Sequence, residues 1–349
     1  MLNNIGLKDF KSLTKERLNF EPLTIITGMN SSGKSTVIQA ILLSIRHARL
    51  ENKYKMEPLV RYLDDFKQIR NKNNNAKEIR IDLISSDGNY ELGITNEGIK
   101  VDGELSFGID LSSEDMSPEL FYLTANRQGP EEISATSSSK VGASGQYIFG
   151  YFDSVKDKAL SEDLCRFKES KTLAYQVSRW LSLVTDTKTE LKTESLSSSQ
   201  VQVYFEDATL GHVSPFNLGA GMSYVAKVII LCLVAKKGDL VIIENPEIHL
   251  HPKAQAELGV FFSFIASSGI QLVVETHCEH LINKIRHQVF EKVLDKNQVV
   301  IHYKAHIATE FQQLFLNGNG HYIDKNNSLV SFPSGFFDGT LNELIEMGG

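Results

Sequence analysis

The chain has 349 residues, of which 42% are apolar and 23% charged, so it can bury a sizeable core and is balanced like an ordinary globular protein. Its net charge of −7 excludes a generic polyanion binder, and its three scattered cysteines argue against a disulfide framework. No stretch of about 18 apolar residues occurs, so we expect no membrane span and a cytoplasmic protein.

The N-terminal part begins with strand patterns and then changes to a helical one. Residues 5–13 and 22–28 show the short apolar bursts of strands, whereas residues 37–45 place apolar side chains at helical spacing. Residues 46–80 are polar and basic, and we expect a loop there. Turn signals within residues 78–109 predict an antiparallel meander.

The rest of the chain returns to alternating elements. Residues 119–130 read as a strand that runs into a loop, residues 131–145 as a mobile Ser/Gly-rich segment, and residues 153–195 as mainly helical. From residue 201 strands alternate with helices, which predicts a parallel sheet with crossover connections. Residues 298–315 return to strands.

The glycine-rich stretch "GMNSSGKST", residues 28–36, fits the pattern G-x-x-x-x-G-K-[ST] and lies between a predicted strand and a predicted helix. Such a loop wraps its backbone around phosphates, and the helix N-terminus adds amide donors and partial positive charge. Here Lys34 would contact the outer phosphates, and Ser35 would bind Mg²⁺. We therefore predict a site for ATP and Mg²⁺ formed by Asn30, Ser31, Ser32, Gly33, Lys34, Ser35 and Thr36.

A second motif, "LVIIENPEIHLHP", ends a buried strand in an acid. Glu244 is placed to hold the Mg²⁺ shell. The next residue, where a water-orienting glutamate is usual, is Asn245, whose amide can position a water but cannot accept its proton. Glu247 could act as the base instead. The alternative is that Pro246 and Glu247 only begin a helix, where an acid favours the dipole.

Two further motifs follow the same logic. In "VVETHCEH" a strand ends before His277, which could contact the γ-phosphate or the water beside it. In "FNLGAGMSY" the glycines Gly219 and Gly221 precede a helix, so their backbone could approach a phosphate. Either motif taken alone could be turn chemistry. Their order behind the first two motifs favours the functional interpretation.

Taken together, these motifs resemble the plan of ABC-type ATPase heads, with Walker A, a signature, Walker B and a switch histidine. Residues 5–36 look like the RecF and SMC branch. Residues 244–258 and 275–286 look like the bacterial branch near the overcoming-lysogenisation-defect ATPases. The stretches "FYLTANRQGP", "VGASGQ" and "FPSGFFD" resemble a bacterial group described as AAA-family ATPases with an uncharacterised C-terminal region, of the kind found in antiphage defence.

The resemblance implies an ATP-sandwiched homodimer or a higher assembly. Gly219, Gly221 and Ser223 would contact the nucleotide held by the other subunit, and His277 would be the switch histidine. Two features depart from the family pattern. The signature reads "LGAGMS" rather than "LSGGQ", and Asn245 replaces the usual catalytic glutamate, so the rate of hydrolysis stays open.

The resemblance also implies the fold, an α/β ABC-type P-loop ATPase head with a mixed or parallel sheet core, an antiparallel β-meander subdomain and a helical insertion. Arg127 and Gln128 would form a Q-loop-like element, and His251 would lie in the D-loop. The predicted division is 1–150 for the N-terminal lobe with Walker A, 151–200 for the insertion, 201–300 for the C-terminal lobe with the other motifs, and 301–349 for a C-terminal β/α extension.

Three functions fit these observations. The first is an ATPase that acts in antiphage defence or DNA maintenance with a separate effector protein, since the chain shows no nuclease constellation. The second is a slow or non-hydrolysing nucleotide-gated switch. The third is the soluble ATPase subunit of a transporter. Residues 1–80 carry a net charge of +7, which makes Arg46–Arg80 a candidate DNA contact, and an ordinary solvated surface is the alternative.

Overall fold

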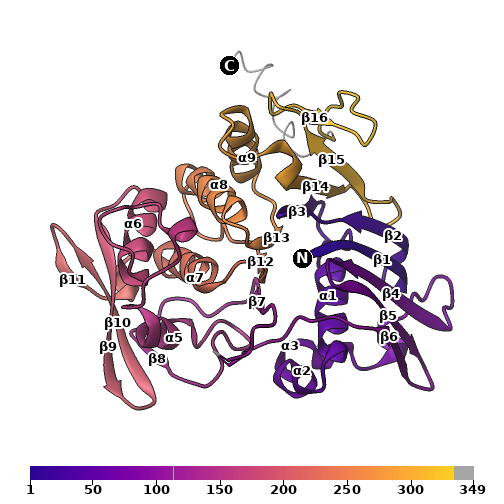
Figure 1. Ribbon diagram of the computed structural model, residues 1–349, viewed down its shortest axis with the longest axis horizontal. Coiled ribbons are helices and arrows are strands. Elements are labelled where there is room, and N and C mark those ends of the chain that lie inside the picture. Colours follow the sequence, from indigo (N-terminus) through magenta and orange to yellow (C-terminus); the bar gives the residue numbers. More distant parts are fainter. Residues whose placement is uncertain (113, 334–349) are drawn as a thin grey trace.

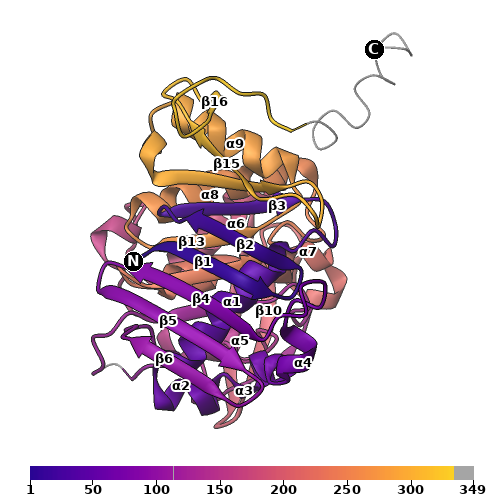
Figure 2. The ribbon, with the colours of Figure 1, turned by 90° about the vertical axis from the view of Figure 1, so that its right-hand side faces the viewer.

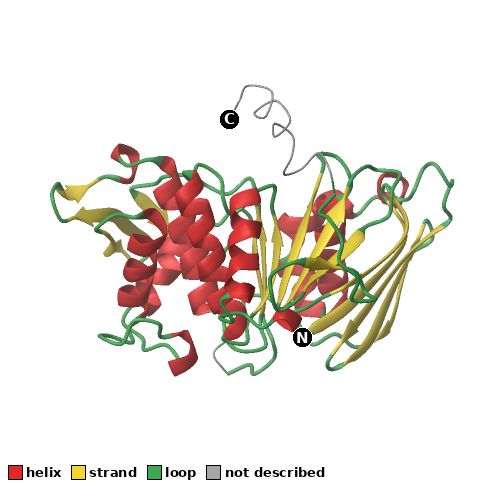
Figure 3. Ribbon diagram, turned by 90° about the horizontal axis from the view of Figure 1, so that it is seen from above, coloured by secondary structure: helices red, strands yellow, loops and turns green. Residues whose placement is uncertain are grey.

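The computed structural model describes residues 1–112 and 114–333. A central sheet separates two layers of helices, and each layer carries an antiparallel sheet on its outer side (Figures 1 and 3). The predicted α/β fold with a mixed core sheet is confirmed. The last residues of the stretch "FPSGFFD" and everything after them lie outside the described residues.

The central sheet is buried on both faces. Its inner strands β7, β12, β13, β3 and β14 are parallel, and β15 and β16 extend it antiparallel. Its order is β16 (Tyr322–Ile323), β15 (Gln312–Leu316), β14 (Val299–Lys304), β3 (Leu23–Gly28), β13 (Gln271–Glu275), β12 (Leu240–Glu244) and β7 (Leu120–Leu123). Because the inner strands are parallel, their carboxyl ends meet at one edge, and the predicted motifs follow these ends.

Alternate residues of the central strands belong to two different hydrophobic cores. In β12, Val241 and Ile243 pack on one side, whereas Leu240 and Ile242 pack on the other. This explains why the run "LVII" of β12 is continuously apolar rather than alternating. The first core includes α7 (Ala220–Val234), α8 (Pro252–Ser267) and α9 (Glu279–Phe290), and the second includes α1 (Lys34–Ala48).

An antiparallel sheet covers α1, and Figure 2 shows its strands side by side. Its order is β2 (Leu13–Asn19), β1 (Leu2–Phe10), β4 (Glu78–Ser85), β5 (Gly88–Thr95) and β6 (Ile99–Gly103). The predicted meander corresponds to the hairpins β4–β5 and β5–β6. Its core-facing positions alternate with exposed ones, as in β4, because one face meets the helix layer and the other meets solvent.

The prediction of a loop over residues 46–80 was wrong. This segment contains α2 (Leu50–Lys55), α3 (Glu57–Val60), a 3₁₀ turn (Arg61–Leu63) and α4 (Phe66–Ile69). The segment is polar on average, but a few of its side chains are buried and hold it in place. Met56, Val60 and Leu63 enter the second core, and the buried Arg46 pairs with Glu57 and Asp64.

The second antiparallel sheet lies at the far end of the molecule, beyond α5 (Ile148–Val155) and α6 (Leu173–Thr185) (Figure 1). It contains β8 (Ile133–Ala135), β9 (Thr189–Ser197), β10 (Gln200–Asp207) and β11 (Gly211–Val213). The expectation that the parallel core resumes at residue 201 was wrong for β10. Its alternating burial marks a strand with one solvated face.

Two further expectations need correction in this region. Residues 131–145, expected to be a mobile Ser/Gly-rich segment, contain β8, which pairs with β10, and the carbonyl of Ser144 accepts a hydrogen bond from the amide of Gln128. The prediction that residues 153–195 are mainly helical was wrong, because within them α6 is the one long helix and β9 begins at Thr189. These residues contribute no strand to the central sheet, which agrees with an insertion, and the division of the chain into domains stays a prediction.

Candidate nucleotide site

The phosphate-binding loop, residues 28–36, connects β3 to α1, as the sequence predicts. Gly28 and Gly33 have φ angles of 136° and 107°, which favour glycine. At Gly28 a Cβ would lie 2.1 Å from the carbonyl oxygen of Lys304, so the loop starts where the neighbouring strand leaves no space for a side chain. The loop is therefore shaped by backbone packing as well as by its turn.

Lys34 is buried, and its ammonium donates a hydrogen bond of 2.6 Å to the carbonyl of Met29 within the same loop. Burial lowers the pKa of Lys34, and the nearby Glu275 carboxylate opposes this shift. The loop thus holds its cation close to the amides at the start of α1. This arrangement suits an anionic ligand such as a triphosphate.

Glu244 ends β12 and is held from the side of β7. Its carboxylate accepts hydrogen bonds of 3.1 Å from the hydroxyl of Tyr122 and 3.1 Å from the amide of Ala125. Asn245 follows with a φ of 44°, in the left-handed region that asparagine tolerates better than most residues. The backbone thus supplies a reason for asparagine here that is independent of catalysis.

Glu275, which the sequence analysis missed, lies at the end of β13 beside the loop. Its carboxylate accepts a hydrogen bond of 3.0 Å from the hydroxyl of Ser35. Burial and the charge of Glu244 raise the pKa of Glu275 to about 7, although the Ser35 hydrogen bond and Lys34 act in the opposite direction. Glu275 is visible in the motif "VVETHC", but its position beside the phosphate-binding loop depends on the order of the strands in the sheet.

Glu247 contacts the backbone of His277 rather than capping a helix. Its carboxylate accepts a hydrogen bond of 3.1 Å from the amide of His277. The alternative that it begins a helix was wrong, because α8 starts at Pro252 and His251 is the capping residue. Burial raises the pKa of Glu247, which brings it closer to the range of a general base. The structure therefore brings together Glu247 and His277 from separate motifs.

His277 precedes α9 at the same edge of the sheet. Burial and the positive charge of Lys34 lower the pKa of His277, so its neutral form is favoured at pH 7. A neutral imidazole can donate or accept one hydrogen bond at each of its nitrogens, according to its tautomer. This is compatible with the predicted contact to a phosphate or a water.

Arg127, predicted to lie in a Q-loop-like element, contacts the Walker B strand end directly. Its guanidinium donates hydrogen bonds to the main-chain carbonyls of Glu244 at 2.8 Å and Asn245 at 2.9 Å, and it lies 5.2 Å from the ring centre of Tyr224. Next to it, the carbonyl of Gln128 accepts a hydrogen bond of 3.2 Å from the buried Lys227. This loop thus joins the strand end to α7.

The signature segment, residues 218–223, starts α7 on the face of the central sheet opposite to α1 (Figure 1). Gly221 packs against the loop after β12, because a Cβ there would lie 2.4 Å from the carbonyl oxygen of His249. Gly219 is open, with nothing within 4 Å of a Cβ. Ser223 is buried, and its hydroxyl has no partner among the described residues. The predicted contact of this segment with the nucleotide of another subunit stays a prediction.

The residues at this edge of the sheet fit Mg²⁺ with a nucleotide. The Ser35 hydroxyl and the Glu244 and Glu275 carboxylates supply oxygen donors, and the Glu275 oxygen Oε2 is buried without a partner among the described residues. Within the same residues no group of three or more His, Cys, Asp or Glu side chains is arranged for a metal. Mg²⁺ needs no such cage, because it commonly binds through one or two carboxylates together with substrate phosphates.

The basic segment Arg46–Arg80 offers fewer free charges than its composition suggests. Arg46 is buried in ion pairs, Arg49 lies 3.2 Å from Asp115, and Arg80 lies 3.2 Å from Glu91. Arg80 also lines a groove of about 1120 Å³ whose walls carry Lys and Arg together with Glu and Asp side chains. A surface of mixed sign is a weaker DNA contact than the net charge predicts.

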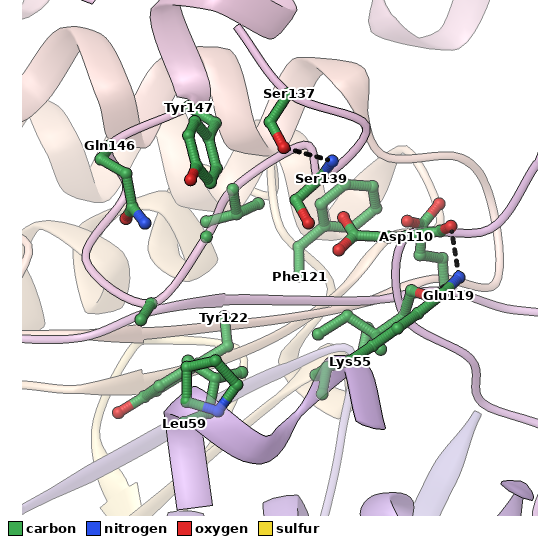
Figure 4. Close-up of a pocket in the computed structure, with 16 residues that line it drawn as sticks. Lys55, Leu59, Asp110, Glu119, Phe121, Tyr122, Ser137, Ser139, Gln146 and Tyr147 are labelled. Carbon is green, nitrogen blue, oxygen red and sulfur yellow. Dashed lines mark hydrogen bonds between the residues drawn. The ribbon is translucent and has the colours of Figure 1, made fainter. Parts of the chain in front are cut away.

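Figure 4 shows a smaller cavity, which has a volume of about 200 Å³. It is lined by Leu59 and Lys55 on one side and by Tyr147 and Gln146 on the other. Tyr122, whose hydroxyl donates a hydrogen bond to Glu244, also lines it.

In the part of the chain that the structure describes, no helix has the length and apolar character needed to cross a membrane.

Comparisons with known proteins identify a family and similar folds. Residues 23–283 match the family described as "AAA domain, putative AbiEii toxin, Type IV TA system". An Smc head bound to the "C-winged helix domain" of ScpA is 14% identical, with a TM-score of 0.52 over 90% of this chain and 98% of that one. A Pyrococcus furiosus Smc head with an extended coiled coil, bound to the C-terminal domain of ScpA, is 12% identical, with a TM-score of 0.54 over 100% of this chain and 99% of that one.

At these identities the structural matches show the fold alone. Among curated proteins, none matches this sequence. The family match covers more than half of the chain and includes residues 28–36, residues 218–223, Glu244 and His277. The chain therefore belongs to this AAA-domain family, and its fold is that of an ABC-type, SMC-like ATPase head.

Proposed function

We propose that this protein binds ATP with Mg²⁺ at residues 28–36 and hydrolyses it, with Glu247 as the general base. The observation that carries the proposal is the convergence of the loop, Glu275 and the Glu247–His277 pair at one edge of the central sheet. Bound Mg²⁺ would neutralise charge on the phosphates. The chain would position the water with Asn245 and accept its proton on Glu247.

Dimerisation around ATP is the second part of the proposal. Gly219 is open to solvent at the N-terminus of α7, so its backbone can approach a ligand that the same subunit does not hold. Two solved structures with a similar fold are Smc heads bound to domains of ScpA. They support the proposal that this protein also works with a separate partner protein. We propose a homodimer or higher assembly that acts through such an effector.

The family description, which names a putative AbiEii toxin and a type IV toxin–antitoxin system, supports a proposal for the biological role. We propose a role in antiphage defence or DNA maintenance in the cytoplasm, with any DNA contact made by residues outside the ion pairs of Arg46, Arg49 and Arg80. A transporter subunit is disfavoured, because the fold is that of an SMC head and the chain carries a five-stranded antiparallel sheet.

A second candidate, a slow nucleotide-gated switch, rests on Asn245. If the Asn245 side chain only positions the attacking water and Glu247 lies too far from that water to accept its proton, ATP would be bound but not hydrolysed. ATP would then stabilise the assembled state in proportion to its preference for that state. Both candidates require ATP binding at the same loop.

The test of nucleotide binding is a titration of the purified full chain with ATP and Mg²⁺, compared with Lys34→Ala. We expect wild type to bind and Lys34→Ala to bind at least tenfold more weakly, a loss of about 1.4 kcal/mol. The exposed Lys253 provides the control, since Lys253→Ala removes a surface cation that pairs with Asp186 rather than with the loop. Equal affinities of wild type and Lys34→Ala would contradict the proposal.

A further inference from the structure

The strand order gives Glu275 a position that Glu244 does not have. β13 lies between β3 and β12, so that Glu275 pairs with Ile26 on one side and with Glu244 on the other. Ile26 lies two residues before Gly28, where the phosphate-binding loop begins. Glu275 is thus the acid next to the loop, and Glu244 is one strand farther away.

The hydrogen bonds of the two carboxylates differ accordingly. Glu244 is satisfied by Tyr122 and Ala125 on the side of β7. Glu275 accepts one hydrogen bond, from Ser35, and its second oxygen Oε2 has no partner among the described residues, although Glu275 is only 6% exposed. A buried carboxylate oxygen without a partner is costly.

Neither of two nearby cations, Lys34 and Arg127, donates a hydrogen bond to this oxygen. The ammonium of Lys34 is bonded to the carbonyl of Met29, and the guanidinium of Arg127 is bonded to carbonyls of the strand end. Glu244 and Glu247 add negative charge around Glu275. The group that would compensate these acids is a bound cation, and it would lie beside the hydroxyl of Ser35.

We propose that Glu275 is a metal-positioning residue of the Mg²⁺ site. The Ser35 hydroxyl donates its proton toward Glu275, which leaves its oxygen lone pairs available to Mg²⁺, and Oε2 of Glu275 is left to accept from a metal-bound water. Glu244 alone would not orient Ser35. This inference rests on the proposed binding of ATP with Mg²⁺.

The test is the Mg²⁺ dependence of nucleotide binding by the full chain, followed with a fluorescent ATP analogue. For Glu275→Gln we expect the affinity measured in EDTA to stay within about threefold of wild type. The Mg²⁺ concentration that half-restores tight binding should rise about 10–100-fold, the usual effect of losing a group that orients a metal ligand. Glu291→Gln, which changes an exposed acid, should leave both values unchanged.

Ser35→Ala provides an independent variant should Glu275→Gln fail to fold. Its effect on the Mg²⁺ requirement and that of Glu275→Gln should not add in the double variant, because both act on one metal ligand. An unchanged Mg²⁺ requirement in Glu275→Gln, or additive effects in the double variant, would overturn the inference. If wild type itself bound no nucleotide with Mg²⁺, the proposed function would fail as well, so the two failures are distinguishable.

Discussion

The guanidinium of Arg127 holds the main-chain carbonyls of Glu244 and Asn245 at 2.8 and 2.9 Å. These residues are more than a hundred positions apart in sequence, and Asn245 has the left-handed φ of 44°. Burial lowers the pKa of Arg127 to about 10, so the side chain stays charged at neutral pH. A fixed cation thus shapes the turn that carries Glu247 into the site.

Replacing the guanidinium of Arg127 with the single ammonium of lysine should loosen the turn that carries Glu247. For Arg127→Lys we expect a loss of about 2 kcal/mol in the free energy of unfolding, because lysine cannot satisfy two carbonyls in this planar geometry. Turnover should fall roughly tenfold to a hundredfold, since small displacements of catalytic groups have effects of this size. Urea unfolding and steady-state ATP hydrolysis would measure both, with the exposed Arg80→Lys as control. Wild-type turnover in Arg127→Lys would contradict the account.

The two signature glycines should behave differently when each is replaced by alanine. Gly221→Ala places a Cβ 2.4 Å from the carbonyl oxygen of His249, so we expect destabilisation of about 1–3 kcal/mol. Gly219→Ala meets open space at a φ of −56°, so the free energy of unfolding should change by less than about 0.5 kcal/mol.

Gly219→Ala then separates folding from assembly. If Gly219 contacts a nucleotide held by another subunit, this variant should keep the wild-type melting temperature but dimerise more weakly with ATP. Light scattering with and without nucleotide would measure the assembly. A variant that dimerises like wild type would remove Gly219 from the interface.

The raised pKa of Glu275 predicts a pH dependence of stability. The folded protein keeps a proton on Glu275 up to about pH 7, whereas the unfolded chain releases it near 4.5. This contribution is therefore fully present below about pH 4.5 and is lost as the pH rises through 7. It amounts to at most about 3 kcal/mol. Urea unfolding without Mg²⁺ or ATP should show a smaller decline from pH 5 to 8 in Glu275→Gln than in wild type, and parallel declines would contradict the shift.

Much of the site could be predicted from the sequence because its motifs are local. The loop 28–36 carries its own glycines and helix start, and Glu244 ends a strand whose continuous apolar run marks burial on both faces. Glu275 could not be predicted in the same way. Its role depends on β13 lying beside β3, and strand order is set by tertiary packing rather than by the residues around it.

The wrong secondary-structure predictions for residues 46–80 and for β10 also arose because tertiary packing decides the structure there. Residues 46–80 looked like a loop because their composition is polar, yet buried side chains such as Met56 and the ion pairs of Arg46 fold them into short helices. β10 looked like the next core strand, yet its alternating pattern fits a sheet with one solvated face. In both cases sparse tertiary contacts outweighed local composition.

The most direct test of the central claim is steady-state ATP hydrolysis by wild type and Glu247→Gln, with Glu291→Gln as a control for removing an exposed acid. Glutamine keeps the shape and the hydrogen bond from the amide of His277 but cannot accept a proton. We predict measurable turnover in wild type and in the control, and a loss of about a hundredfold or more in Glu247→Gln with ATP binding retained. Equal turnover in wild type and Glu247→Gln would contradict the assignment of Glu247 as the base.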